Sequence, residues 1–266
     1  MEPELKLSGW ALILGSSSGF GEAIALELAR RGMDIFGVHF DRRATLPEAE
    51  RIVAEIRALG RNVHFFNVNA ADPEQRKTVL DVVAAETQGK PAVRTLVHSL
   101  AFGTLRPYIC EPAAEGLSAA QMNMTLDVMG HSLVYWTQDL VARNLIGDRG
   151  RIFAMTSAGG HRVWPAYGAV SAAKAALESH IRQLAFELAP RGITANAICA
   201  GVTDTPALRK IPGADVLIAG ARQKNPSLRL TETKDVARTI AALSHPATAW
   251  LTGNVINVDG GEDLSG

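Results

Sequence analysis

The chain has 266 residues, with 27 basic and 27 acidic side chains and an apolar fraction of 47%. Such a composition is typical of a globular protein with a substantial core, and the balanced charge argues against a broad nucleic-acid-binding surface. The two cysteines, Cys110 and Cys199, lack metal-ligand spacing, so we expect no metal site. No apolar run approaches the roughly 20 residues that span a bilayer, and the polar N-terminus has no signal-peptide pattern. We therefore expect a cytoplasmic protein without a membrane partner.

Strand-like and helix-like segments alternate from one end of the chain to the other. Apolar runs predict strands at Trp10–Leu14, Ile35–Phe40, Val63–Val68, Thr95–Ser99, Arg151–Met155, Thr194–Ala197 and Val255–Val258. Helical patterns cover Gly21–Arg31 and Pro47–Leu59, each followed by a glycine, and Asp72 before a proline begins a third helix. This alternation predicts a single α/β domain over residues 1–266, with a Rossmann-type, doubly wound parallel sheet and helices on both faces.

A glycine-rich turn lies between the first predicted strand and the first predicted helix. Glycines let the backbone approach a pyrophosphate closely, and the helix N-terminus offers unpaired N–H groups and a positive dipole end. A turn of this kind can also be merely structural, but its place at the first β–α junction favours a dinucleotide. The residues that we assign to cofactor binding here are Gly15, Ser17, Ser18, Gly19, Phe20 and Gly21.

Together with the glycine-rich turn, the segments that follow the later strands resemble those of the short-chain dehydrogenase/reductase superfamily. The resemblance extends over nearly the full chain. The segments are Asn67-Val68, His98–Ala101, Thr156-Ser157, Ala200–Thr205 and Leu251–Gly261. The carboxyl ends of parallel strands are where an open α/β sheet binds its ligand. The resemblance implies that Asn67 and Val68 flank the adenine, that Leu100 approaches the ribose, and that Thr203 and Thr205 contact the carboxamide and the pyrophosphate. Ser99 and Gly201 complete the expected cofactor contacts.

Tyr167 and Lys174 are separated by 174 − 167 = 7 positions, whereas the usual catalytic pair of the superfamily has the spacing Tyr-x-x-x-Lys. Four positions before Lys174 is Val170, which cannot donate a proton. Seven positions give about 10.5 Å of helical rise, against about 6 Å for four. Lone tyrosines and lysines on helices are usually packing or surface residues. The resemblance nevertheless implies that Lys174 anchors the nicotinamide ribose and that Tyr167 is an acid moved away from it.

A displaced phenol fits the reduction of a 2-enoyl thioester. Hydride then arrives at C3 while negative charge collects on the C1 oxygen, so the stabilising group must sit away from the hydride acceptor. Tyr-x6-Lys resembles the enoyl-acyl-carrier-protein reductases of fatty acid synthesis. That resemblance implies an acyl-carrier-protein or acyl-CoA thioester as the substrate. It further implies catalytic roles for Tyr167, Lys174 and Ser157, and substrate contacts from Tyr167, Phe102 and Gly103.

Two departures matter here: one indicates the branch of that family, and the other weakens the interpretation as an ordinary alcohol dehydrogenase. Position 157, ten before Tyr167, holds serine rather than the second tyrosine that many enoyl reductases carry there. Serine at this position is similar to the NADPH-dependent, dehydrogenase-like bacterial branch. The relay asparagine of ordinary dehydrogenases aligns with Met129. Two alternatives stay open: a carbonyl or hydroxy-group reductase with a rearranged tyrosine, and a cofactor-binding protein without turnover.

The end of the second strand bears on the choice between NADPH and NADH. His39 stands at the usual position of an NAD-type acid, and Arg42 and Arg43 nearby favour the 2′-phosphate of NADPH. Asp41 has the opposite effect, because a carboxylate repels a phosphate. A solvated turn is the plain alternative for these residues. We expect NADPH, with NADH possible.

The stretch 205–228 is irregular and is expected to form a substrate lid. Its prolines and Gly213 interrupt long helices, while Ala214–Arg222 favours a short one. The apolar side chains that we expect to face the acyl chain are Leu208, Ile211, Val216, Leu217 and Ile218. A permanently packed connection is the alternative. The resemblance also implies a homotetramer built on the helix Tyr167–Ala189 and on Leu251–Gly261.

Overall fold

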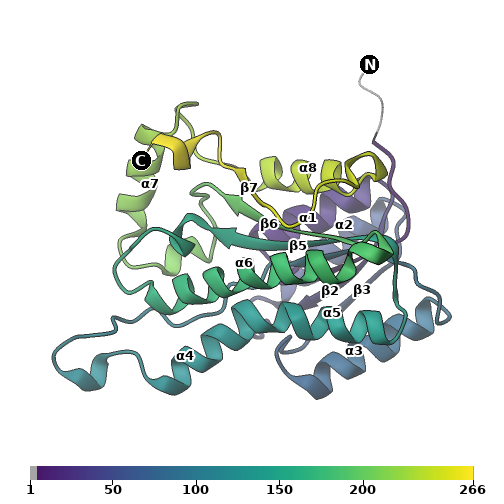
Figure 1. Ribbon diagram of the computed structural model, residues 1–266, viewed down its shortest axis with the longest axis horizontal. Coiled ribbons are helices and arrows are strands. Elements are labelled where there is room, and N and C mark those ends of the chain that lie inside the picture. Colours follow the sequence, from purple (N-terminus) through teal and green to yellow (C-terminus); the bar gives the residue numbers. More distant parts are fainter. Residues whose placement is uncertain (1–4, 266) are drawn as a thin grey trace.

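The computed structural model describes residues 5–265 and is organised around one seven-stranded sheet (Figure 1). The strands are β1 Trp10–Leu14, β2 Asp34–His39, β3 Val63–Asn67, β4 Val93–His98, β5 Ile146–Ser157, β6 Thr194–Ala200 and β7 Val255–Val258. Their order in the sheet is β3-β2-β1-β4-β5-β6-β7, and all six neighbouring pairs are parallel. The predicted Rossmann-type α/β fold is therefore confirmed.

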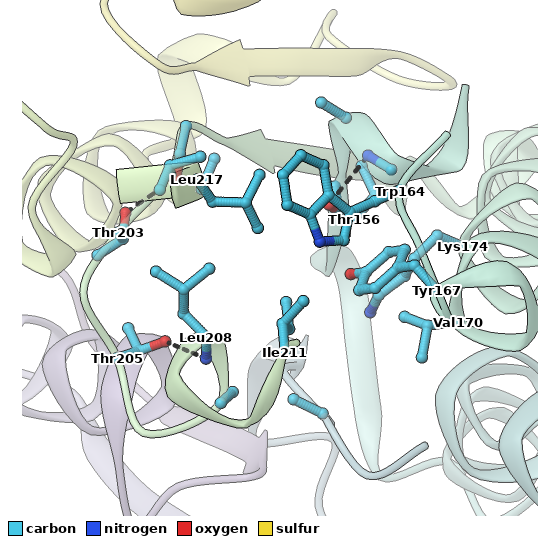
Figure 2. Close-up of a pocket in the computed structure, with 18 of the residues that line it drawn as sticks. Thr156, Trp164, Tyr167, Val170, Lys174, Thr203, Thr205, Leu208, Ile211 and Leu217 are labelled. Carbon is cyan, nitrogen blue, oxygen red and sulfur yellow. Dashed lines mark hydrogen bonds between the residues drawn. The ribbon is translucent and has the colours of Figure 1, made fainter. Parts of the chain in front are cut away.

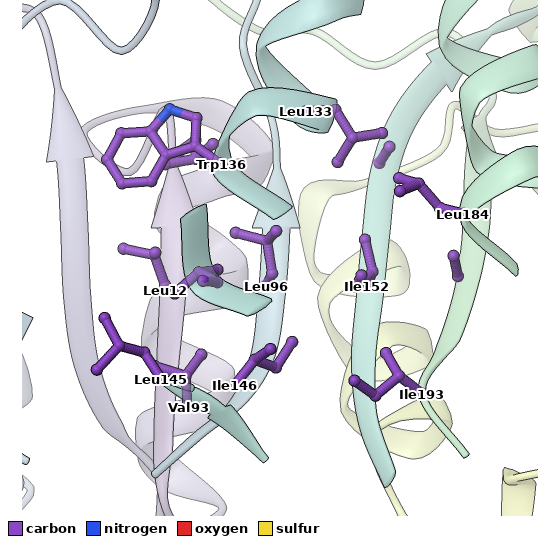
Figure 3. Close-up of a cluster of buried hydrophobic side chains, with 14 of the residues drawn as sticks. Leu12, Val93, Leu96, Leu133, Trp136, Leu145, Ile146, Ile152, Leu184 and Ile193 are labelled. Carbon is purple, nitrogen blue, oxygen red and sulfur yellow. The ribbon is translucent and has the colours of Figure 1, made fainter. Parts of the chain in front are cut away.

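Helices cover both faces of the sheet and enclose two separate cores (Figure 1). One core holds side chains of α1 Gly19–Arg30, α2 Leu46–Ala58 and α8 Thr233–Leu243. The other holds side chains of α3 Pro73–Glu86, α5 Ser132–Ala142 and α6 Gly168–Leu188. Figure 3 shows the second core, where Leu133 and Trp136 of α5 lie over Leu12 and Leu96 of the sheet. Burial of such side chains on both faces explains why the central strands are almost continuously apolar.

The strand order reverses between β1 and β4, and this reversal opens the sheet at its carboxyl edge. The segments after the two strands separate toward opposite faces, since β1 continues to β2 on one side and β4 to β5 on the other. They remain in contact at their starts, where the Ser99 N–H donates to the carbonyl oxygen of Leu14 at 2.8 Å. Open α/β sheets bind their ligands at such a switch point.

Local signals placed most element boundaries within two residues of those observed. Asp72 caps α3 as expected, because its carboxylate accepts hydrogen bonds from the N–H groups of Glu74 and Gln75, both at 2.9 Å. The exceptions are β6, which ends at Ala200 rather than at Ala197, and β5, which begins at Ile146 rather than at Arg151. Its pairing with β4 shifts register near Thr95, and Arg149 there adopts a left-handed φ of 62°. In the sequence this bulge resembles a turn, so the strand was predicted to begin after it.

Two further segments border the carboxyl edge of the sheet. A π-helical turn, Asp127–His131, joins α4 Ala119–Leu126 to α5. After β6, the chain forms the short turn Leu208–Lys210 and then α7 Ala214–Lys224. The last described turn, Glu262–Ser265, returns to lie beside α7 (Figure 1). Among residues 5–265, no helix has both the length and the apolar character needed to cross a membrane.

Candidate active site

A cavity of about 580 Å³ lies at the carboxyl ends of the strands (Figure 2). Of the site residues expected from the sequence, those that line it are Phe20, Ser99, Leu100, Gly103, Ser157, Tyr167, Lys174, Gly201, Thr203 and Thr205. Those outside its lining are Gly15, Ser17, Ser18, Gly19, Gly21, Arg42, Asn67, Val68 and Phe102. Most of this second group flanks the β1–α1 turn and the ends of β2 and β3. The arrangement suits an elongated ligand whose reactive end enters the cavity.

The β1–α1 turn is shaped by the absence of side chains. A Cβ atom on Gly15 would lie 2.4 Å from the carbonyl oxygen of Ser99, and one on Gly21 would lie 1.8 Å from that of Gly15. Ser18 occupies the N-cap of α1 without capping it through its side chain. The first N–H groups of α1 are therefore available to an anion. These features fit the pyrophosphate of a dinucleotide.

The end of β2 holds an acidic group in a network of hydrogen bonds. The carboxylate of Asp41 accepts hydrogen bonds from Thr45 at 2.7 Å and contacts His39 Nδ1 at 2.8 Å. Burial would raise the pKa of this carboxyl, but hydrogen bonds from Ser17, Thr45 and His39 lower it overall. Asn67 is bonded to the backbone of Asp41 through both atoms of its amide. The turn that was predicted to meet the ribose is thus fixed in place and carries a charged carboxylate.

Tyr167 stands at the N-cap of α6 and presents its phenol to the cavity (Figure 2). The turn after β5 packs against the ring so closely that a Cβ atom on Gly159 would lie 2.5 Å from it. Burial raises the pKa of the phenol, and a hydrogen bond with Ser157 opposes that shift. Ser157 and Tyr167, which were both predicted to be catalytic, are therefore brought together. At neutral pH the phenol is protonated and able to donate a hydrogen bond.

Lys174 lies two turns further along α6 and is 5% exposed. Its ammonium donates a hydrogen bond to the carbonyl oxygen of Met155 at 2.7 Å. Burial lowers the pKa of this lysine from 10.5 to about 8, while the nearby carboxylate of Glu178 acts in the opposite direction. Glu178 itself accepts a hydrogen bond from Thr156 at 2.6 Å. A buried ammonium held in this way suits a fixed contact with a polar ligand.

The positions that ordinary members of the superfamily use for the acid and the relay are apolar here. Val170 and Met129 are 4% and 3% exposed, and both line the cavity. Gly103 lies against them, because a Cβ atom on it would approach the Met129 sulfur to 2.8 Å and Val170 to 2.9 Å. Tyr167 is the phenol in the cavity lining. The phenol in the folded site is therefore displaced from the ordinary acid position, as the spacing predicted.

The segment 205–228 covers one side of the cavity with apolar side chains. Leu208, Ile211, Val216 and Leu217 line it, and Ile218, which was expected to join them, does not. Trp164, which comes from the turn before α6, donates a hydrogen bond from its Nε1 to the carbonyl oxygen of Pro212 at 2.9 Å. Figure 2 shows Trp164 and Tyr167 on one side and Leu208 on the other. This contact joins the turn before α6 to the expected lid.

The sequence did not single out the C-terminal contribution to the site. Glu262 lines the cavity and accepts a hydrogen bond from the N–H of Val202 at 3.1 Å. Burial raises the pKa of the Glu262 carboxyl, and the Val202 bond opposes that shift. Asp263 also lines the cavity and pairs with Arg162, with 2.7 Å between Arg162 Nε and Asp263 Oδ1. A polar turn after a last strand gives no local signal that it returns to the site.

The chain matches known proteins over most of its length. A family model described as "Enoyl-(Acyl carrier protein) reductase" matches residues 15–262. An NADPH-dependent aldehyde reductase-like protein of Arabidopsis thaliana is 31% identical, over 98% of this chain and 96% of its own length. A 1-cyclohexenylcarbonyl-CoA reductase of Streptomyces collinus is 29% identical, over 94% of this chain and 85% of its own length.

Solved structures agree with these relatives. The crystal structure of an enoyl-[acyl-carrier-protein] reductase (NADH) of Aquifex aeolicus superposes with a TM-score of 0.84 at 25% identity, covering 99% of each chain. The names of these similar proteins include NADPH-dependent and NADH-dependent reductases of different substrates. The chain belongs to the short-chain dehydrogenase/reductase superfamily, as an NAD(P)-dependent oxidoreductase.

Proposed function

We propose that the protein reduces the 2,3 double bond of an enoyl thioester, as an enoyl-acyl-carrier-protein reductase of fatty acid synthesis. One observation carries the proposal: the phenol in the cavity comes from Tyr167, while the ordinary acid position, Val170, is apolar and also lines the cavity. The phenol is thereby separated from Lys174 by two helical turns. Such a separation suits a substrate in which charge develops two carbons away from the carbon that accepts hydride.

The protein's own groups have distinct tasks in this reaction. The nicotinamide, when bound, supplies the hydride to C3 of the substrate. Tyr167 donates a hydrogen bond to the thioester oxygen, where the enolate charge collects, and Ser157 orients the phenol. Lys174 is buried in the lining of the cavity and holds its ammonium beside the Met155 carbonyl. Leu208, Ile211 and other apolar side chains of 205–228 exclude water from the enolate.

A carbonyl or hydroxy-group reductase is the second candidate. It is favoured by the 31% identity to an aldehyde reductase-like protein along nearly the whole chain. Ser157 also stands 170 − 157 = 13 positions before Val170, at the usual distance of the catalytic serine from the ordinary tyrosine. In this alternative, Tyr167 reaches a ketone oxygen directly. A protein that binds the cofactor without turnover is the third.

We propose NADPH as the preferred cofactor, with NADH as the alternative. Arg42 is exposed at the turn after β2, where it is accessible to a 2′-phosphate. The carboxylate of Asp41 opposes this preference, because its lowered pKa keeps it charged. The two cofactors are therefore expected to differ modestly in affinity.

The partners proposed are an acyl-carrier protein or CoA thioester and three further copies of this chain in a homotetramer. β7 is the last strand of the sheet, so one of its edges is unpaired in the isolated chain. Near it, Trp250 is 98% exposed, and Phe186 at the end of α6 is 79% exposed. Exposed aromatic side chains beside an open strand edge are typical of surfaces that pack on another copy. We propose the cytoplasm as the compartment.

A direct assay separates the three functions. Crotonyl thioester and acetoacetyl thioester are each supplied with NADPH or NADH, and oxidation is followed at the nicotinamide absorbance. We expect turnover of the crotonyl compound. Turnover of acetoacetyl thioester alone would support the carbonyl reductase. Cofactor binding by calorimetry without turnover of either substrate would support the third candidate.

A further inference from the structure

His98 is a fully buried histidine at the carboxyl end of β4, and no step of the proposed reaction uses it. It pairs in register with Ala154 of β5. Leu96, two residues earlier on the same strand, belongs to the core beneath α5 and α6. Because side chains alternate along a strand, His98 points into that same layer. Lys174 of α6 is buried in this layer as well.

The hydrogen bonds around His98 determine which ring nitrogen carries the proton. Nε2 lies 2.8 Å from the hydroxyl oxygen of Ser132. That hydroxyl has a single proton and donates it to the carbonyl oxygen of Val128 at 2.8 Å. Ser132 therefore accepts from His98, so Nε2 is the protonated nitrogen. Nδ1 is then an acceptor, and within residues 5–265 this buried atom has no donor to accept from, because the carbonyl oxygen of His98 itself, which acts on the ring, can only accept.

The ammonium of Lys174 lies near enough for its charge to act on the His98 ring. It contacts the carbonyl oxygen of Met155, the residue that follows the register partner of His98 on β5. An ammonium has three protons, and the Met155 carbonyl takes one of them. Burial, together with the positive charge of Lys174, lowers the pKa of His98 to about 3. The imidazole is therefore neutral at any pH at which the protein would work, and Nδ1 stays able to accept.

We propose that His98 is a positioning residue for Lys174, and that one internal water molecule accepts a proton from the lysine ammonium and donates to Nδ1 of His98. A buried acceptor without a partner costs about 1–3 kcal/mol, and internal waters typically satisfy such groups. The bridge assigns His98 a role in any reaction that uses Lys174, and so it does not depend on which substrate is reduced.

Two substitutions at His98 test the contributions of the two ring nitrogens independently. In His98→Gln the side-chain amide reaches the place of Nε2 and leaves nothing at Nδ1. In His98→Asn the shorter amide lies at the place of Nδ1, where its oxygen can accept, and loses the contact with Ser132. Ser132→Ala is the control, because it removes the partner of Nε2 and keeps Nδ1. Melting temperatures identify any variant that has lost its fold.

The primary measurement needs no substrate. Lysine is labelled with ¹³C at Cε, and the Lys174 signal, assigned with Lys174→Ala, is titrated by NMR. Glu178, the other charged group that acts on Lys174, is the same in every variant. Loss of an acceptor disfavours the charged ammonium. We therefore expect the wild-type pKa of about 8 to fall by about one unit in His98→Gln and to be largely restored in His98→Asn and kept in Ser132→Ala.

Two outcomes would overturn the proposal. The first is equal Lys174 titration in the Gln and Asn variants. The second needs only the wild-type protein: ¹⁵N NMR of the histidine rings showing the proton of His98 on Nδ1 rather than on Nε2. A high-resolution crystal structure supports the proposal if a water lies within hydrogen-bond distance of both His98 Nδ1 and Lys174 Nζ, and contradicts it if neither atom has such a partner.

Discussion

Around the β1–α1 turn the site is shaped by backbone and by missing side chains, whereas around Trp164 it is shaped by apolar side chains. At the turn, a single added methyl group on Gly21 would lie 1.8 Å from a carbonyl oxygen. On α7, a methyl group added to Gly220 would meet nothing within 4 Å. One end of the site thus has almost no tolerance for added volume, and the other has room.

This difference explains which part of a ligand each end of the site can recognise. A backbone cradle recognises a group that is the same in every ligand, such as a pyrophosphate. An apolar wall, which Trp164 contacts through its hydrogen bond to Pro212, can adapt to substrates of different shape. Tyr167 and Lys174 stand between the two ends, so substitutions there test the chemistry itself.

The largest effect is expected from Tyr167→Phe. In the proposed reaction the phenolic hydroxyl stabilises the enolate, so its removal should lower kcat for enoyl reduction by about 10²–10⁴-fold. The affinity for NAD(P)H, measured by calorimetry, should stay near the wild-type value. Tyr135→Phe, on α5, is the matched control. An unchanged kcat in Tyr167→Phe would remove this residue from the mechanism.

Gly21→Ala is expected to weaken cofactor binding by about tenfold or more, since the backbone of the turn must move to admit the methyl group. Gly220→Ala is the counterpart at the open end and should leave the cofactor affinity unchanged. Calorimetric titration of both variants with NADPH measures the contrast. Equal losses in the two variants would show that the two ends do not differ as described.

The pH dependence of kcat/KM should report the titration of Lys174, which lies between the two ends of the site. Burial lowers its pKa to about 8, so the ammonium loses its proton as the pH rises through that value. If the charged form is required, kcat/KM should fall about tenfold for each pH unit well above the pKa. The pH–rate profile from about pH 6 to about pH 10, on both sides of the pKa, provides the measurement. A flat profile across that range would contradict a requirement for the charged lysine.

Trp164→Phe should give the smallest effect. It keeps an aromatic ring and removes the hydrogen bond to Pro212, so KM for the enoyl thioester should rise a few-fold, about the effect of one hydrogen bond. Limited proteolysis within 205–228 should become faster. Cofactor with a substrate analogue should slow cleavage in both proteins if the segment closes over the ligand. Identical cleavage with and without ligands would rule out a ligand-gated lid.

The sequence by itself determined the strand and helix pattern and the place of the site. Most of the seven strands are recognisable as short apolar runs bounded by glycine, proline or a polar residue, and Asp72 before a proline likewise marks the start of α3. Polar segments such as Asn67-Val68 and Ala200–Thr205 follow directly on strands, so parallel strands bring them to one edge. The seven-residue spacing of Tyr167 and Lys174 likewise belongs to one helix and its cap.

Only the tertiary structure decided the contacts between segments far apart in the chain. Glu262 reaches Val202, Trp164 reaches Pro212, and His98 shares a buried layer with Lys174. The local sequence around each of these residues does not indicate which distant residue it contacts. Their meeting depends on how helices pack on a twisted sheet, and the free energy of that packing comes from burial summed over the whole core rather than from any local pattern.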